Sequence, residues 1–161
     1  KLDTNGSHPH MLEELIGKKQ IDYVAMDIKN APGKYQETTG LAVEGAYAEA
    51  SDMAFPVKAV QQSVELLKNC TIPYEFRTTV VKEFHTQQEL KEICVWIAGC
   101  SAYYLQQFED SGQLIAKMEG SVDKGMIFHA YEEAEIKRIA EHLNHIPGME
   151  GKVHLRGMNG E

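Results

Sequence analysis

Segments with the apolar spacing of strands alternate with segments that have the spacing of helices along the sequence. Short apolar or alternating runs predict strands at residues 1–4, 21–28, 74–81, 102–108 and 152–156. Apolar residues three and four positions apart predict helices at residues 9–16, 56–68 and 131–145, and between the caps Thr86 and Gly99. This β-α-β-α-β-α-β-α-β order predicts an α/β fold, a parallel sheet with helices packed on it, in a single domain over residues 1–161.

Local signals refine the ends of these elements. Ser7 is a plausible N-cap for the first helix, and Thr86 with Glu89 has the spacing of a capping box. Residues 29–53 form an irregular connection that is longer than most loops, which is typical of a functional or mobile segment.

The charged residues of the first three strands fall on one face, because side chains alternate along a strand. These residues are Asp3, Asp27, Lys29, Glu75 and Arg77. The opposite face of the same strands carries Leu2, Val24, Met26, Ile28, Phe76, Thr78 and Val80. A sheet with helices on both sides should be apolar on both faces, so the pattern favours a curved sheet or barrel with a polar lumen.

Two interpretations of the charged face remain open. Unpartnered buried charges would cost several kcal/mol each, so these residues must pair with one another, with water or with a ligand. A structural ion-pair network is the simpler interpretation. A ligand site is favoured by position, because Asp3, Asp27 and Lys29 lie at the carboxyl ends of strands, where parallel α/β folds bind ligands.

Composition narrows the class of protein. The 161 residues are 43% hydrophobic and 25% charged, which is ordinary for a globular domain, and the net charge of −8 argues against a nucleic-acid surface. No apolar stretch approaches the ~18 residues that span a membrane, and no signal peptide is recognisable. The three cysteines lack close metal-ligand spacing, and Cys94 falls on an apolar helix stripe. We therefore expect a cytoplasmic protein with reduced thiols that binds neither nucleic acid nor membrane.

Several motifs, taken together, resemble the radical S-adenosylmethionine activating enzymes. They are "LDTNG" at 2–6, "DYVAMDIK" at 22–29, "YEFRTTVV" at 74–81, "YLQQF" at 104–108 and "VHLRG" at 153–157. Within this family, the sequence most resembles activases of the anaerobic ribonucleotide reductase. Pyruvate formate-lyase activating enzyme, a cousin of these activases, is a more distant relative. The motifs follow one another over nearly the whole chain, which makes the combined signal strong although each motif alone is weak.

The resemblance implies a partial (β/α)6 barrel that holds a 4Fe–4S cluster and S-adenosylmethionine. Reductive cleavage of the latter gives a 5′-deoxyadenosyl radical, which takes hydrogen from a glycine of a partner enzyme. The implied partners are a glycyl radical enzyme, expected to be anaerobic ribonucleotide reductase, and an electron donor such as flavodoxin.

The resemblance also implies roles for individual residues. Asp3 and Asp27 match carboxylates that hold a monovalent cation against the carboxylate of the cofactor, and the carbonyl groups of Thr4 and Ala25 match its backbone ligands. All four therefore count as both cofactor-binding and metal-binding candidates.

Three further positions match the active site of the family. Lys29 matches a lysine near the reacting centre and is the catalytic candidate, and Arg77 matches an arginine that faces the bound cofactor. Phe108 stands where the cousin has a cofactor-contacting histidine, so the same contact is not expected there.

Two family motifs have no counterpart in the sequence: the Cys-x-x-x-Cys-x-x-Cys loop after the first strand and Gly-Gly-Glu after the second. The chain therefore contains no expected iron–sulfur ligands, because three thiolates must hold three irons of the cluster. We expect the chain to be the C-terminal portion of a barrel, namely strands three to six and the C-terminal extension. As such a fragment it should be inactive alone, bind neither cofactor, and self-associate through its exposed barrel edge.

Other functions fit the same residues. The strand motifs also occur in radical enzymes that act on small molecules, and a truncated, non-catalytic binding module has the same sequence pattern. Lys29 has the chemistry for a Schiff-base lyase, but nothing else in the sequence supports that reaction.

Overall fold

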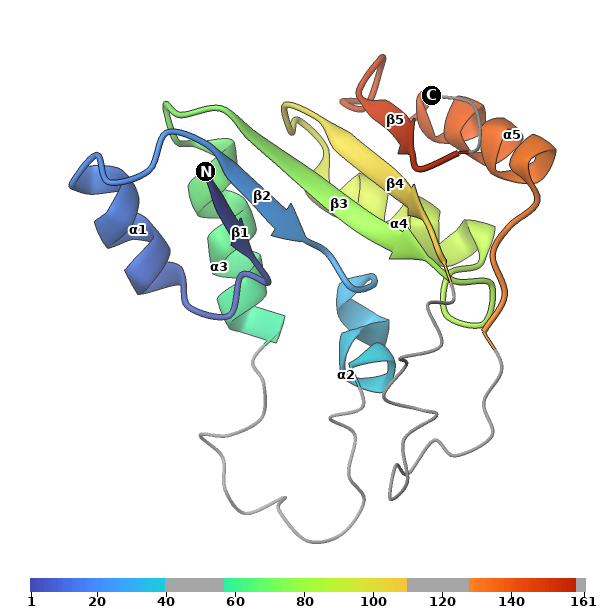
Figure 1. Cartoon of the computed structure of the whole chain (residues 1–161), viewed down its shortest axis with the longest axis horizontal. Helices are drawn as coiled ribbons and strands as arrows, with labels where there is room; N and C mark the ends of the chain where they lie inside the picture. The colour runs from blue at the N-terminus through green and yellow to red at the C-terminus, as the bar shows by residue number, and fades with distance from the viewer. Residues whose placement is uncertain (40–56, 110–127, 159–161) are drawn as a thin grey trace, which may run out of the picture.

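The computed structural model describes residues 1–39, 57–109 and 128–158, and its centre is one parallel sheet of five strands (Figure 1). The strands are β1 (Leu2–Thr4), β2 (Val24–Asp27), β3 (Tyr74–Val80), β4 (Tyr103–Gln107) and β5 (Val153–Arg156). They lie side by side in the order of the chain, and all four pairings are parallel. The predicted α/β fold with a parallel sheet is confirmed.

Helices pack on one face of this sheet. They are α1 (Pro9–Gly17), α2 (Tyr35–Thr38), α3 (Val57–Lys68), α4 (Gln87–Ile97) and α5 (Glu133–Leu143), with a short 3-10 helix, η1 (Pro32–Lys34). In Figure 1, α3 and α4 lie behind the sheet, and no helix lies over its front face in the described part of the chain. One helix-covered face and one uncovered face are what the alternation of charge predicted.

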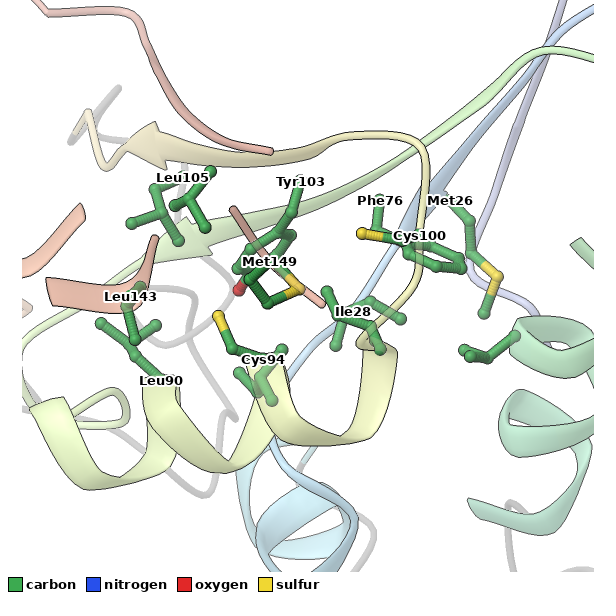
Figure 2. Packing of buried hydrophobic residues seen from close by; sticks show 14 of the residues in the cluster. Met26, Ile28, Phe76, Leu90, Cys94, Cys100, Tyr103, Leu105, Leu143 and Met149 are labelled. Carbon is green, nitrogen blue, oxygen red and sulfur yellow. The ribbon is translucent and has the colours of Figure 1, made fainter. Parts of the chain in front are cut away.

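The core lies between the sheet and the helices. Strand residues of the predicted apolar face, such as Met26, Phe76 and Leu105, are fully buried, and Figure 2 shows them pointing toward the helix layer. Leu90 and Cys94 of α4 meet them from the other side. Burying one such aliphatic or aromatic side chain contributes roughly 1.5–3 kcal/mol, so this layer fixes which face of each strand turns away from the helices.

The ends of the helices agree with the sequence in one case and differ in two. The capping box is confirmed: the side chain of Thr86 accepts the Glu89 N–H, and the Glu89 carboxylate accepts the Thr86 N–H at 3.0 Å. The Ser7 cap is wrong: α1 begins at Pro9 as predicted, its N-cap is therefore His8, and the Ser7 hydroxyl pairs with Nδ1 of His8 at 2.7 Å. The predicted helix at 131–145 begins only at Glu133, because the chain before it is extended and buries Tyr131 in the core.

Two other predicted boundaries also need correction. The strand expected at 21–28 covers only Val24–Asp27, since the paired residues of β1 and β3 begin opposite Val24. The connection expected to be irregular over 29–53 contains η1 and α2, which begin where Pro32 enters a first helical turn. Residues 40–53 of that connection, and Pro56 of the next predicted helix, lie outside the described residues.

Among the residues that the structure describes, no helix combines the length and apolar character needed to cross a bilayer.

Candidate functional site

Four of the predicted site residues come together on the uncovered face, where the carboxyl ends of β1 and β2 lie beside the middle of β3. Arg77 of β3 donates from Nη1 to Asp3 of β1 at 2.7 Å and from Nε to Asp27 at 2.5 Å. Lys29, just beyond β2, donates from Nζ to the second oxygen of Asp27 at 2.9 Å. We call Asp3, Asp27, Lys29 and Arg77 the Asp27 cluster.

The charges of the Asp27 cluster balance, and the cluster is open to solvent. Within the cluster two carboxylates share one guanidinium group and one ammonium group completes the set, while the ammonium group of Lys1 lies outside it, 3.8 Å from Asp3. The side chains of Asp3 and Lys29 are 53% and 46% exposed, whereas that of Arg77 is 19% exposed. Burial opposes ionisation of Asp27, but the hydrogen bonds from Arg77 and Lys29 outweigh it and hold the pKa of this carboxyl below its usual value.

A cavity of about 140 Å³ adjoins the cluster. The residues that line it include Asp27, Lys29, Arg77, Thr79, Phe84 and His85. Pockets for whole small molecules usually measure ~300–1,000 Å³, so this cavity has room for one polar end of a ligand rather than for all of it.

The remaining predicted positions have other surroundings. The hydroxyl of Thr4 accepts the Gly6 N–H at 3.1 Å and thereby shapes the turn after β1. Ala25 is fully buried and in register with Asp3. Phe108 packs against Phe128, with ring centroids 6.3 Å apart. The cation-binding role expected of the Thr4 and Ala25 carbonyl groups stays a prediction.

A second charged cluster lies on the same face, nearer the amino end of β3. Glu75 accepts two hydrogen bonds from Arg156, at 2.7 and 3.1 Å, and one from the hydroxyl of Tyr23 at 2.7 Å. The guanidinium group of Arg156 stacks 3.8 Å from the ring centre of Tyr104. We call Tyr23, Glu75, Tyr104 and Arg156 the Glu75 cluster.

The pKa values of the Glu75 cluster reflect the burial of its groups and the hydrogen bonds between them. Hydrogen bonds from Arg156 lower the pKa of Glu75 against the opposing effect of burial. Burial, together with the adjacent Glu75 carboxylate, raises the pKa of Tyr23 to about 12. The network therefore stays ionised on Glu75 and protonated on Tyr23 throughout the neutral range.

Buried polar groups fix the chain at the end of β2, and sequence reasoning missed them. The carbonyl of Ile28 accepts the hydroxyl of Thr78 at 2.7 Å, and that of Lys29 lies 2.8 Å from Nε2 of His85. Asn30 donates to the Phe84 carbonyl at 2.8 Å. His85 and Asn30 lie in connections without periodicity, so their sequence gives no signal beyond residue types that are uncommon in a core.

The three cysteines do not fit a cluster of iron and sulfide. Cys94 and Cys100 are buried among the apolar side chains of the core, where burial raises the pKa of Cys94 to about 12 and that of Cys100 to about 11. Cys70 is partly exposed and its sulfur lies 3.4 Å from the Ile72 carbonyl. Within 1–39, 57–109 and 128–158, no three His, Cys, Asp or Glu side chains are grouped to hold a metal ion.

Comparison with known proteins points to one group of enzymes. No family model matches the chain. Over 109 residues, 68% of the chain, it is 34% identical to the protein named "Putative glycyl-radical enzyme activating enzyme MJ1227" from Methanocaldococcus jannaschii. The aligned part is 42% of that protein, so the chain spans less than half the length of this curated relative.

A solved structure shares the fold. It is a domain of pyruvate-formate lyase-activating enzyme from Bacteroides vulgatus, with a TM-score of 0.63 and 11% sequence identity. The match covers 96% of this chain and 79% of that domain, and at this identity it shows the fold alone. The sequence comparison supports the resemblance to glycyl-radical enzyme activating enzymes, and the structural comparison supports the fold that this resemblance implies.

Proposed function

We propose that the chain contributes the S-adenosylmethionine-binding side of an enzyme that installs a glycyl radical on a partner enzyme, with anaerobic ribonucleotide reductase as the target. The Asp27 cluster carries this proposal. It places two carboxylates and two cations together on the open face, with Asp3, Asp27 and Lys29 at the carboxyl ends of adjacent parallel strands, where α/β folds bind their ligands.

The charges of the cluster complement the methionyl end of the cofactor. That end is a zwitterion with one ammonium and one carboxylate group, and the cluster offers partners of both signs at hydrogen-bonding distance from one another. A zwitterion can therefore replace existing ion pairs with charge-assisted hydrogen bonds without leaving a charge unpaired. The adjoining cavity of about 140 Å³ suits such an end group.

A monovalent cation belongs to the same proposal, with Asp3, Asp27 and the carbonyl groups of Thr4 and Ala25 as ligands. The guanidinium group of Arg77 already bridges the two carboxylates. Cation binding would therefore require Arg77 to release at least one of them and turn toward the carboxylate of the cofactor. Arg77 would then face the cofactor, as proposed for it from the sequence.

S-adenosylmethionine and a 4Fe–4S cluster, when bound, supply the radical that takes hydrogen from the glycine. The cysteines of this chain do not fit the cluster, so its ligands must come from residues outside this sequence. Within the chain, the Asp27 cluster binds and orients the cofactor, and the Lys29 ammonium group lies nearer the reacting end. We treat residues 1–161 as one domain that performs this task.

Substitutions in the intact protein test this function. Asp27→Asn should weaken S-adenosylmethionine binding roughly 10- to 100-fold, the size expected when a hydrogen bond to a charged group is lost. Lys29→Met should slow glycyl-radical formation more than it weakens binding. Calorimetric titration measures the binding, release of 5′-deoxyadenosine measures cleavage of the cofactor, and the glycyl-radical resonance signal measures radical formation.

Lys34→Met is the matched control, since Lys34 lies in the same connection and its ammonium group contacts Glu37, not the cluster. If Asp27→Asn and Lys29→Met behave like this control, the Asp27 cluster is a structural ion-pair network. Release of 5′-deoxyadenosine without a glycyl radical on any partner would instead favour a small-molecule substrate.

A further inference from the structure

The main chain at Lys29 is held from two sides, although its side chain is exposed. The Lys29 N–H donates to the hydroxyl of Tyr35 at 3.3 Å, and the Lys29 carbonyl lies 2.8 Å from Nε2 of His85. Tyr35 and His85 are only 1% and 3% exposed. The next residue, Asn30, is tied to the same turn through the Phe84 carbonyl. The backbone that carries the proposed catalytic ammonium group is therefore one of the most constrained parts of the open face.

The hydrogen bonds around His85 determine which ring nitrogen carries the proton. The Val81 N–H points at Nδ1 at 3.1 Å, which makes Nδ1 an acceptor. The Val81 carbonyl lies 3.2 Å from Nδ1, but it already accepts the N–H groups of Phe84 and His85 at 3.1 and 2.9 Å. The proton therefore sits on Nε2, from which it is donated to the Lys29 carbonyl. Burial favours the same neutral ring by lowering the pKa of His85.

We propose that His85 is a positioning residue for Lys29: its neutral Nε2–H form fixes the main chain from which the Lys29 ammonium group reaches the ligand. This inference rests on the proposed function of Lys29. A lysine side chain is a flexible four-carbon stem, so its reach is defined only as well as the backbone that carries it. Displacement of a reacting group by ~1 Å can cost about 100-fold in rate, which gives a distant hydrogen bond a measurable effect on catalysis.

Two substitutions separate the hydrogen bond to Lys29 from the packing of the ring. The amide of His85→Gln extends to about the place of Nε2 and keeps a donor for the Lys29 carbonyl. The shorter His85→Asn reaches only the place of Nδ1, where its oxygen accepts the Val81 N–H but no donor faces Lys29. Both variants bury an amide, so a difference between them reports the Lys29 bond rather than the loss of a buried imidazole.

The first measurement is structural and needs no cofactor. In the intact protein, long-range proton–nitrogen spectra should show His85 as the Nε2–H form. Hydrogen exchange of the Lys29 amide should accelerate about fivefold or more in His85→Asn, the size of one net hydrogen bond, and change less than about twofold in His85→Gln. Equal exchange in both variants and the wild type would overturn the inference. If neither variant folds, the wild-type spectrum decides, because an Nδ1–H form of His85 cannot donate to the Lys29 carbonyl and would overturn the inference.

The second measurement is kinetic. His85→Asn should slow glycyl-radical formation about tenfold with less than about a twofold change in affinity for S-adenosylmethionine, and His85→Gln should restore most of the rate. Normal turnover in His85→Asn, in an active wild-type background, overturns the positioning role. A wild-type protein that never cleaves S-adenosylmethionine overturns the proposed function instead, while amide exchange still decides whether His85 fixes Lys29.

Discussion

The two charged clusters of the uncovered face each pair a guanidinium group with carboxylate, but they differ in how far their charged groups are shielded from solvent. In the Glu75 cluster, three hydrogen bonds converge on a carboxylate that is 5% exposed, and a ring stacks on the guanidinium group. In the Asp27 cluster, the outer carboxylate and the ammonium group are about half exposed. Exposed ion pairs add little stability, whereas removal of one partner from a closed pair is costly.

This difference indicates that the Glu75 cluster stabilises the sheet, whereas the Asp27 cluster is available to bind a ligand. The Glu75 cluster joins Tyr23, just before β2, to β3, β4 and β5 across the face, and its charged groups already have their partners. The Asp27 cluster joins the carboxyl ends of β1 and β2 to the middle of β3 and leaves donors and acceptors turned to solvent. Stability explains the charges of the first cluster but not those of the second, which is the physical reason to place ligand binding at the second.

The largest expected effect on stability comes from removing the carboxylate at the centre of the Glu75 cluster. Glu75→Gln should lower the free energy of unfolding by about 2–3 kcal/mol, because a buried charge partner of Arg156 is removed. The partial exposure of Arg156 keeps the loss from being larger, since water can solvate the released guanidinium group. Urea denaturation of the intact protein measures the change.

Glu37→Gln is the control for this substitution, because Glu37 is exposed and its ion-pair partner within the described part of the chain is the exposed Lys34, at 2.8 Å. We expect no measurable change from it. Equal stability of the two variants would mean that the Glu75 cluster does not brace the sheet, and the contrast between the clusters would disappear.

Acid should weaken both clusters, by less than the substitution, since a protonated carboxyl keeps part of its hydrogen bonds. The pKa values of Asp27 and Glu75 are lower in the folded chain than their ordinary values. The unfolded chain therefore binds protons first, so this stability is complete above about pH 4.5 and is lost as the pH falls further. Urea midpoints measured across that range should decline less steeply in Glu75→Gln than in the wild type. Parallel declines would contradict the lowered pKa of Glu75.

The sequence predicted the open cluster better than the closed one. Alternation along each strand placed Asp3, Asp27 and Arg77 on one face, and parallel strands bring their carboxyl ends to one edge, so simple geometry sufficed. The partner of Glu75 lies outside this rule. Arg156 is in register with Gln106 but reaches Glu75 across the ring of Tyr104, a diagonal contact set by side-chain direction rather than by spacing.

The contacts made by residues in connecting segments also could not be predicted from the sequence. The contact of His85 with Lys29 depends on how the turn after β3 packs against the end of β2, and no periodic pattern encodes that packing. The same limit explains the misplaced start of α5, because Tyr131 enters the core from extended chain and donates to the His85 carbonyl at 2.7 Å. Residue patterns specify which face of a strand or helix is buried. Hydrogen bonds between connecting segments depend instead on how the assembled fold packs these segments together.

A smaller effect is expected from the ring that closes the Glu75 cluster. Tyr104→Leu should cost about 0.5–1 kcal/mol of unfolding free energy, because the contact between the Arg156 guanidinium group and the ring is lost. Tyr104→Phe keeps the ring and should cost much less. In a Glu75→Gln background the cost of Tyr104→Leu should change, since the two contacts share Arg156. Strict additivity would show that stacking and ion pairing are independent.

The smallest expected change in stability is at the outer edge of the open cluster. Asp3→Asn should alter the free energy of unfolding by less than about 0.5 kcal/mol, because the carboxylate is half exposed and Arg77 keeps its bond to Asp27. The same substitution should weaken S-adenosylmethionine binding to the intact protein several-fold, since one of the two proposed carboxylate ligands of the cation is lost. Urea denaturation and calorimetric titration of one preparation give both numbers. A stability loss as large as that of Glu75→Gln, with unchanged affinity, would show that Asp3 stabilises the fold. The Asp27 cluster would then be a structural ion-pair network and not a ligand site.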